Sequence, residues 1–180
     1  MAQKEMKRPV VFLDCDGVLA NSHAHMSPQW CDDAPYDADP TLFPHSENAH
    51  APLECPCLEQ LARIVKSTGA SVVLSTTWRH NADQRAFLVL ALAAYGVDVI
   101  GDTPNIGLAR RGEEVAAWLE ANAFDGRFVI LDDGHEEEFD HVGLLDHVVL
   151  TVMCDALVGR PGEGLTPTAA DAAIELLAPQ

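Results

Sequence analysis

Short runs of apolar residues alternate with amphipathic segments along most of the chain. Each run is four or five residues long and rich in β-branched residues or Leu. Such runs are typical of strands that are buried on both faces. They occupy residues 10–13, 71–75, 97–100, 128–131 and 148–151. Because strands buried on both faces usually belong to a parallel sheet covered by helices, the pattern predicts an α/β fold.

The segments between these runs have the periodicity and end signals of helices. We expect helices over 58–67, 83–95 and 113–122, and a last helix that begins at Thr166-Pro167. Gly69 and Gly96 follow the first two, at the position where helices often end in glycine. Strands that alternate with helices predict right-handed crossovers and a ligand site beyond the carboxyl ends of the strands.

Residues 20–53 interrupt the alternation. They carry many Asp, Pro, His, Asn and Ser residues and show no clean period. A loop of this length is usually functional, and this one leaves the first predicted strand at its carboxyl end. We therefore expect a single domain over 1–180, with 20–53 as an irregular loop over the site rather than a second domain.

Composition excludes several classes of protein. The chain has 180 residues, with 11 Lys and Arg against 28 Asp and Glu, and a formal net charge of −17. This balance argues against binding nucleic acid by charge alone. No apolar run reaches the roughly 18 residues of a membrane span, and the charged start of the chain lacks the features of an export signal. We expect a cytoplasmic protein that uses no membrane partner.

The five Cys are therefore expected to be reduced. Cys31, Cys55 and Cys57 lie near four His, which raises the alternative of a zinc site. Structural zinc pairs usually have two or more residues between their Cys, and here a single residue separates Cys55 from Cys57. Free thiols are the better interpretation.

Acidic pairs follow the first and fourth predicted strands. Asp14 and Asp16 flank the end of the first strand, and Gly17 permits a bend that brings both carboxylates to one small volume. One Asp can attack phosphorus as a nucleophile while the other handles the leaving-group proton. Asp132-Asp133 ends the fourth strand. Because such a cluster needs a cation, these oxygen ligands predict a Mg²⁺ site.

Hydroxyl and cationic side chains complete the predicted constellation. Ser75 and Thr76 end the second strand and offer hydroxyls and backbone N–H groups to phosphate oxygens. Arg110 and Arg111 precede the fourth strand, and one of them would supply the positive charge that phosphoryl transfer needs.

Trp78 and Arg79, which follow the predicted phosphate-binding turn, have two interpretations. In the first, Trp78 stacks a base or ring of the substrate and Arg79 binds a second phosphate. In the second, Trp78 packs in the protein and Arg79 forms an ion pair.

The order of these motifs resembles that of the haloacid dehalogenase (HAD) superfamily of phosphatases. Over about residues 9–155, the motif Asp14-x-Asp16-Gly17-Val18-Leu19 is followed by a strand-terminal Ser, a basic residue and Asp132-Asp133. The resemblance implies a three-layer α/β/α fold with a doubly wound sheet of strand order 5-4-1-2-3. It also implies a Mg²⁺ cofactor and an aspartyl-phosphate intermediate.

The resemblance implies a role for each acidic residue. Asp14 would be the nucleophile, and Asp16 would be the general acid and base, with its backbone carbonyl on Mg²⁺. Asp132 would ligate Mg²⁺, and Asp133 would ligate it or orient its waters. The implied metal residues are thus Asp14, Asp16, Asp132 and Asp133.

The remaining roles concern the phosphate. Ser75 would bind the transferring phosphoryl group, with Thr76 beside it. Arg111, or in its place Arg110, would stabilise the charge of that group, at a position where the family more often has Lys.

A narrower resemblance is carried by four further stretches. They are Ser75-Thr76-Thr77-Trp78-Arg79, Arg111-Gly112-Glu113-Glu114, Ile130-Leu131-Asp132-Asp133 and Gly164-Leu165-Thr166. Together they are similar to the small HAD domains associated with RNA-repair proteins, which lack a large cap. This resemblance implies a phosphate at a nucleic-acid end as substrate.

We therefore expect a Mg²⁺-dependent phosphomonoester hydrolase with little or no cap. Its substrate would be a phosphorylated small molecule such as a nucleotide, or a phosphorylated nucleic-acid end. The alternative is a module on the same fold that binds a phosphorylated ligand, or docks on a partner protein, without catalysis. Release of phosphate distinguishes the two.

Overall fold

A five-stranded parallel sheet lies at the centre of the computed structural model, which describes residues 7–20, 53–107, 110–155 and 160–179. The strands are β1 (Val10–Leu13), β2 (Ser71–Leu74), β3 (Val99–Asp102), β4 (Phe128–Asp132) and β5 (Val148–Leu150). Their order across the sheet is β3-β2-β1-β4-β5, which is the expected order read from the other edge. The predicted doubly wound α/β fold is therefore confirmed.

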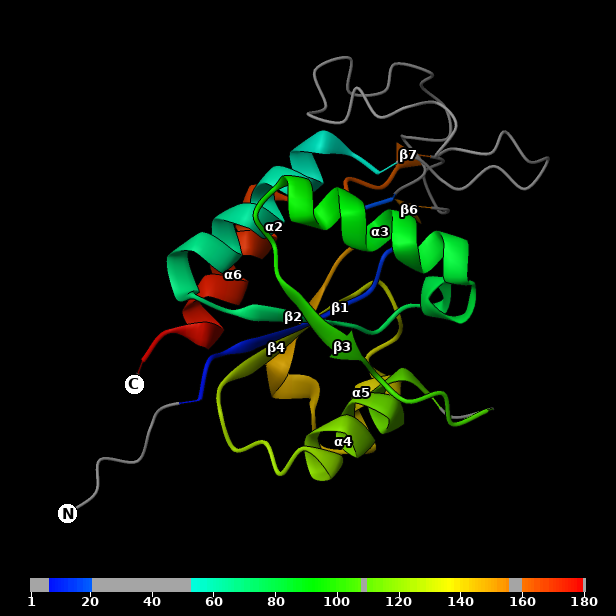
Figure 1. Cartoon of the computed structure of the whole chain (residues 1–180), viewed down its shortest axis with the longest axis vertical. Helices are drawn as coiled ribbons and strands as arrows, with labels where there is room; N and C mark the ends of the chain where they lie inside the picture. The colour runs from blue at the N-terminus through cyan, green and yellow to red at the C-terminus, as the bar shows by residue number, and fades with distance from the viewer. Residues whose placement is uncertain (1–6, 21–52, 108–109, 156–159, 180) are drawn as a thin grey trace.

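Helices cover both faces of the sheet (Figure 1). One face carries α2 (Cys55–Thr68), α3 (Ala82–Ala94) and α6 (Pro167–Leu177), and the other carries α4 (Arg111–Ala121) and the short α5 (Glu137–Asp140). Successive side chains of a strand point to opposite faces. Val11 and Leu13 of β1 accordingly belong to the first core cluster, and Val10 and Phe12 belong to the second. The three-layer architecture follows from this alternation.

The second core cluster is the more aromatic of the two. The ring of Phe12 lies 5.2 Å from that of Trp118 and 5.8 Å from that of Phe128, both in edge-to-face geometry. Edge-to-face contacts contribute beyond the area that they bury. The first contact packs α4 against β1, and the second joins β1 to β4.

The third strand departs from its predicted bounds. We expected it at 97–100, but β3 runs over Val99–Asp102. Val97 instead closes the turn after α3, where its N–H donates to the carbonyl of Leu92 at 3.0 Å and its side chain is buried. The apolar character of Val97 thus reflects packing against α3 and not pairing in the sheet.

The carboxyl ends of the central strands are aligned at one edge of the sheet. The N–H of Asp14 donates to the carbonyl of Leu131 at 3.0 Å, and the N–H of Ser75 donates to the carbonyl of Leu13 at 2.8 Å. β1 lies between β2 and β4, where the crossover helices change face. This is the switch point at which α/β sheets bind ligands.

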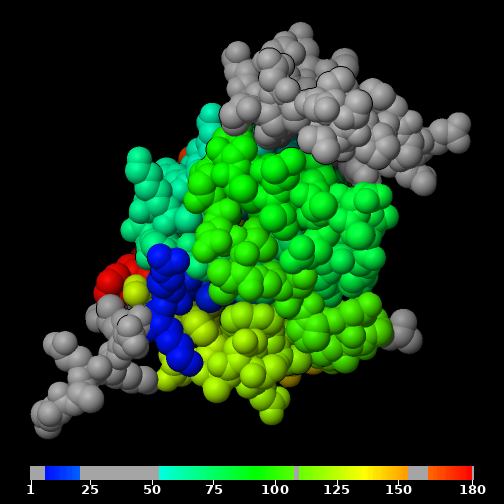
Figure 2. Space-filling model, viewed as in Figure 1, coloured from blue at the N-terminus to red at the C-terminus, as the bar shows by residue number. Residues whose placement is uncertain are grey.

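The chain before β1 is tied to the turn after α4. The ammonium group of Lys7 lies 3.3 Å from the carboxylate of Asp125 and 5.6 Å from the centre of the Phe124 ring. In Figure 2 the first described residues, in blue, lie against the yellow-green surface of this segment. The ion pair is exposed, so its main effect is to direct the chain into β1.

Some expectations fall outside the described residues. The irregular loop expected over 20–53 lies almost wholly there, and the expectation of little or no cap depends on it. No helix in the described part of the chain is long and apolar enough to cross a membrane. Cys15 and Cys57 are free thiols as expected, whereas Cys55 is disulfide-bonded, so the expectation of reduced thiols is wrong for that residue.

Candidate functional site

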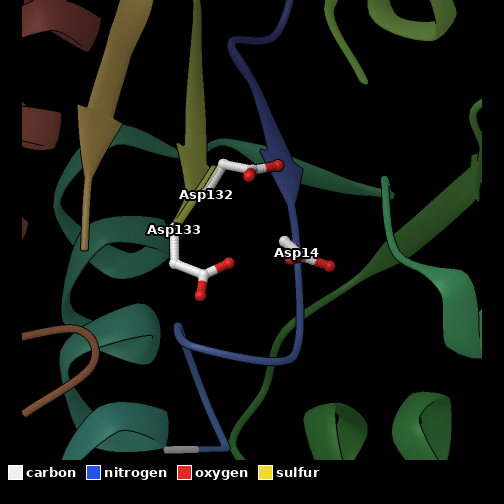
Figure 3. A group of neighbouring side chains, drawn as sticks. All are labelled: Asp14, Asp132 and Asp133. Atoms are coloured by element: carbon white, nitrogen blue, oxygen red, sulfur yellow. The ribbon is translucent and has the colours of Figure 1, made fainter. Parts of the chain in front are cut away.

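Three carboxylates meet where β1 and β4 end side by side (Figure 3). Asp14 follows β1, Asp132 is the last residue of β4, and Asp133 follows it. One oxygen from each side chain lies within 4.8 Å of the others. Asp14 and Asp132 are only 6% and 3% exposed. The structure thus brings together the two acidic segments that the sequence placed at the ends of separate strands.

Burial and mutual repulsion disfavour the charged forms of these carboxylates. Burial raises the pKa of Asp14 to about 6, although the nearby Arg111 acts in the opposite direction. Burial and then the charge of Asp14 raise the pKa of Asp132 to about 7. The pKa of Asp133 is also raised, first by burial. The cluster therefore has less positive charge around it than three ionised carboxylates require.

One carboxylate oxygen of the cluster lacks a hydrogen-bond donor among the described residues. Asp132 Oδ1 accepts a hydrogen bond from the N–H of Gly134 at 2.8 Å. Its Oδ2 has no hydrogen-bond donor among the described residues, although Arg111 Nε forms an ionic contact with it at 3.4 Å. Buried carboxylate oxygens are normally satisfied by donors or by a metal. The residues of the cluster therefore fit a divalent cation that prefers oxygen ligands.

Gly17 allows the loop after β1 to approach Asp133 closely. Its φ of +75° lies in the left-handed region, which favours glycine. A Cβ added there would lie 2.2 Å from the carboxyl group of Asp133. The hydroxyl of Thr151 donates to the Gly17 carbonyl at 2.8 Å and holds the turn in place. Gly17 thus serves the bend expected from the sequence and also leaves room for a carboxylate of the cluster.

Arg111 is the cation that reaches the cluster. It is the first residue of α4, and its guanidinium lies 3.6 Å from Asp14 Oδ1 and 3.4 Å from Asp132 Oδ2. Arg110 is exposed, and its backbone N–H donates to Glu113 Oε2 at 3.2 Å. Of the two arginines that the sequence left open, Arg111 is the one beside the carboxylates.

Ser75 and Thr76 follow β2 and are fully buried beside Asp14. The hydroxyl of Thr76 accepts a hydrogen bond from the N–H of Trp78 at 3.4 Å and donates to Asp14, which lowers the pKa of that carboxyl. Ser75 Oγ has no hydrogen-bond partner among the described residues. Thr76 therefore orients Asp14, whereas the Ser75 hydroxyl is available to form a hydrogen bond with a ligand.

Trp78 and Arg79 face the protein interior. Both belong to the 3₁₀ turn η2 (Thr77–His80). Trp78 is 4% exposed, and its ring lies 6.3 Å from that of Phe87. Arg79 Nη2 lies 2.6 Å from Glu114 Oε2, with both side chains buried. These contacts favour packing and ion pairing over substrate contact for both residues.

Asp16 is not one of the three clustered carboxylates, although its charge is among the causes that raise the pKa of Asp133. Its Oδ2 accepts a hydrogen bond from the indole Nε1 of Trp78 at 3.0 Å. The side chain of Asp16 is therefore oriented by η2, and its carboxylate does not belong to the group of three that could share a metal ion.

Glu114 is a residue of the site that the sequence analysis missed. Its Oε2 lies 2.6 Å from Arg79 and 3.4 Å from Arg111, so one carboxylate joins the two arginines. The sequence analysis named Glu114 only within the stretch Arg111-Gly112-Glu113-Glu114, which carries the narrower resemblance. The spacing of three residues from Arg111 was a signal for an ion pair on one helix face.

Comparison with known proteins agrees with this geometry. A model of the HAD domain in Swiss Army Knife RNA repair proteins matches residues 10–157. A search of curated proteins and a search of solved structures each found no significant match. The matched segment begins at β1 and contains all five strands of the sheet and every carboxylate of the cluster. The chain therefore belongs to the family of HAD domains of the Swiss Army Knife RNA repair proteins.

Proposed function

We propose that this protein hydrolyses phosphomonoesters through attack by Asp14. The observation that carries the proposal is the meeting of Asp14, the two carboxylates at the end of β4 and Arg111 in one buried place. A nucleophilic carboxylate, a set of hard oxygen ligands and a cation are the parts that phosphoryl transfer requires. Titratable groups with strongly raised pKa values at a strand-end site also favour a chemical role over a structural one.

Asp14, Asp132 and Asp133 are the residues that would hold a divalent cation, with the backbone carbonyl of Asp16 as a further ligand. When bound, Mg²⁺ supplies positive charge that keeps Asp14 ionised and offsets the charge of the phosphate oxygens. The raised pKa values of Asp14 and Asp132 support this assignment, because burial disfavours their charged forms and a bound cation would offset that cost.

The Asp14 carboxylate would attack phosphorus in line with the leaving oxygen. A bond forms between a carboxylate oxygen and phosphorus while the ester P–O bond breaks, and protonated Asp16 gives its proton to the leaving oxygen. The products of this step are an alcohol and an aspartyl-phosphate. Water then attacks the phosphorus, Asp16 takes the proton of that water, and the Asp14 carboxylate and inorganic phosphate are released.

The phosphoryl group would be held by Ser75, Thr76 and Arg111. Ser75 Oγ is buried and has no partner among the described residues, so it is able to donate to a phosphoryl oxygen. Thr76 keeps Asp14 oriented through its hydroxyl and would offer its backbone N–H to the phosphate. Arg111 already contacts Asp14 and would neutralise charge on the transferring group.

We infer that the substrate is a nucleotide or a phosphorylated nucleic-acid end. The family of RNA-repair HAD domains supports this class. The net charge of −17 would repel the rest of a long polyanion, so we expect recognition to concentrate on the terminal phosphate and its neighbouring nucleotide.

Phosphate release from a panel of compounds tests the proposal. The panel contains p-nitrophenyl phosphate, mononucleotides, sugar phosphates and oligonucleotides phosphorylated at either end, each with and without Mg²⁺. We expect Mg²⁺-dependent release by the wild type and none by Asp14→Asn. The control is Asp98→Asn, because Asp98 is exposed and lies at the amino end of β3, whereas the cluster lies at the carboxyl ends of the strands.

Two outcomes would contradict the proposal. Full activity in Asp14→Asn would exclude this residue as the nucleophile. No release from any compound by a folded protein that binds Mg²⁺ would favour the non-catalytic alternative, a module that binds a phosphorylated ligand.

A further inference from the structure

The indole of Trp78 contacts the carboxylate of Asp16 across the edge of the sheet. Nε1 lies 3.0 Å from Oδ2, a usual length for an N–H···O hydrogen bond, between residues 62 positions apart in the chain. Asp16 belongs to the turn after β1, and Trp78 belongs to η2 after β2. The contact therefore connects the proposed proton-transfer residue to a separate segment.

Trp78 is the fixed partner of this pair. It is buried beside Phe87, and its backbone N–H donates to Thr76 Oγ1 at 3.4 Å. Its carbonyl accepts from the N–H of Asn81 at 3.2 Å. The side chain of Asp16 is less buried than that of Trp78. The indole therefore orients the carboxylate, and not the reverse.

The chemistry of the indole distinguishes the two oxygens of Asp16. An indole N–H donates a hydrogen bond and accepts none. The oxygen that receives it cannot also carry a proton directed at the same N–H, because two hydrogens would then face each other. In a protonated carboxyl group the carbonyl oxygen is a better acceptor than the hydroxyl oxygen, so the hydrogen bond to Oδ2 favours a proton on Oδ1.

We propose that Trp78 is a positioning residue for Asp16: its indole N–H holds Oδ2 and leaves Oδ1 as the oxygen that gives and takes the proton. The catalytic consequence rests on the proposed function, whereas the contact itself does not.

Substrates that differ in leaving group separate this role from a purely structural one. A p-nitrophenolate leaves without a proton, whereas the alkoxide of a nucleoside or of glycerol needs one. General acid catalysis contributes about 10²- to 10⁴-fold. A misplaced Asp16 should lose part of this, so Trp78→Phe should lower kcat for an alkyl phosphate about 10- to 100-fold with KM little changed. For p-nitrophenyl phosphate we expect a fall of less than about threefold.

Trp118→Phe is the matched control. It removes an indole N–H from the aromatic cluster around Phe12 on the other face of the sheet. It should change kcat for neither the alkyl phosphate nor p-nitrophenyl phosphate. In an Asp16→Asn background, Trp78→Phe should cause no further fall in kcat, because the group that it positions is already gone. Equal losses for both substrates, or additive losses in the double variant, would overturn the proposal.

A nuclear magnetic resonance measurement tests the contact on which the proposal depends, without any turnover. The chain has three Trp, so its ¹H–¹⁵N spectrum contains at most three indole signals. After assignment, Asp16→Ala should move the Trp78 indole proton upfield and speed its exchange with solvent, while the Trp118 signal stays in place. An unchanged Trp78 signal would overturn the proposal. If the wild type releases no phosphate, the proposed function fails and this spectrum still tests the contact.

Discussion

The carboxylate of Glu114 contacts two arginines at once, the buried Arg79 and the half-buried Arg111. Its Oε2 lies 2.6 Å from Arg79 Nη2 and 3.4 Å from Arg111 Nη1. The side chains of Arg79 and Glu114 are 4% and 8% exposed, so water contributes little screening. Glu114→Gln keeps the size and shape of the side chain and removes its charge. We expect this variant to be less stable, because Arg79 stays charged and buried.

The structure sets the magnitude of the loss. Removing one partner of a buried ion pair costs about 3–5 kcal/mol, since the remaining charge is uncompensated. Arg79 also donates to the carbonyls of Thr76, Thr103 and Pro104, which partly compensate its charge. The amide oxygen of Gln can still accept one hydrogen bond. The expected fall in the free energy of unfolding is therefore at the lower end, about 3 kcal/mol.

Urea unfolding followed by circular dichroism measures this change. Glu113→Gln is the matched control, because the Glu113 side chain is 44% exposed and contacts His141 at the surface. We expect the midpoint for Glu114→Gln to fall clearly with an unchanged slope, and the midpoint for Glu113→Gln to stay near that of the wild type. If both variants unfold at the wild-type midpoint, the bridge between Arg79 and Arg111 contributes no net stability and our account of it is wrong.

Two further predictions concern the carboxylate cluster. Gly17→Ala should cost more stability than Gly69→Ala and should abolish stabilisation by Mg²⁺. Both glycines have a left-handed φ, so both substitutions strain the backbone. Only at Gly17 would the added Cβ meet Asp133, at 2.2 Å, whereas at Gly69 it would meet nothing within 4 Å. Equal losses in thermal unfolding would refute the role of the clash. In EDTA, the protein should lose stability as pH rises from about 5 to 8. The pKa is raised from 3.8 to about 6 for Asp14 and to about 7 for Asp132. The folded state therefore binds more protons than the unfolded state in this pH range. Thermal unfolding across this range checks the sign, and a melting temperature that rises with pH would contradict it; added Mg²⁺ should stabilise more at pH 8 than at pH 5.5.

Strand positions could be predicted where burial on both faces leaves a continuous apolar run. This holds for β1, β2 and β4, whose residues are all buried. It failed for the bounds of β3, an edge strand with partly exposed residues. Its neighbour Val97 is more buried than the strand itself, so hydrophobicity pointed to the wrong residues. The order of the strands followed from the family resemblance and not from periodicity.

The carboxylates of the site could be predicted because parallel strands bring their ends to one edge. The choice between Arg110 and Arg111 could not, since neighbouring helical residues point about 100° apart and the start of α4 decides which one faces the cluster. The contact between Trp78 and Asp16 and the ion pair between Arg79 and Glu114 join segments far apart in sequence. No local pattern encodes the direction of a side chain across such a distance.

The turn η2 connects two parts of the candidate site. Trp78 donates a hydrogen bond to Asp16 on one side. On the other side, Arg79 forms an ion pair with Glu114, which also contacts Arg111. Two consecutive residues therefore set the separation between the carboxylate of Asp16 and the guanidinium of Arg111. Replacing the segments that carry Asp16 and Arg111 would leave this separation intact, whereas one residue inserted into Thr77–His80 would change it. For redesign of substrate choice, η2 is the part of the molecule whose length has to be kept.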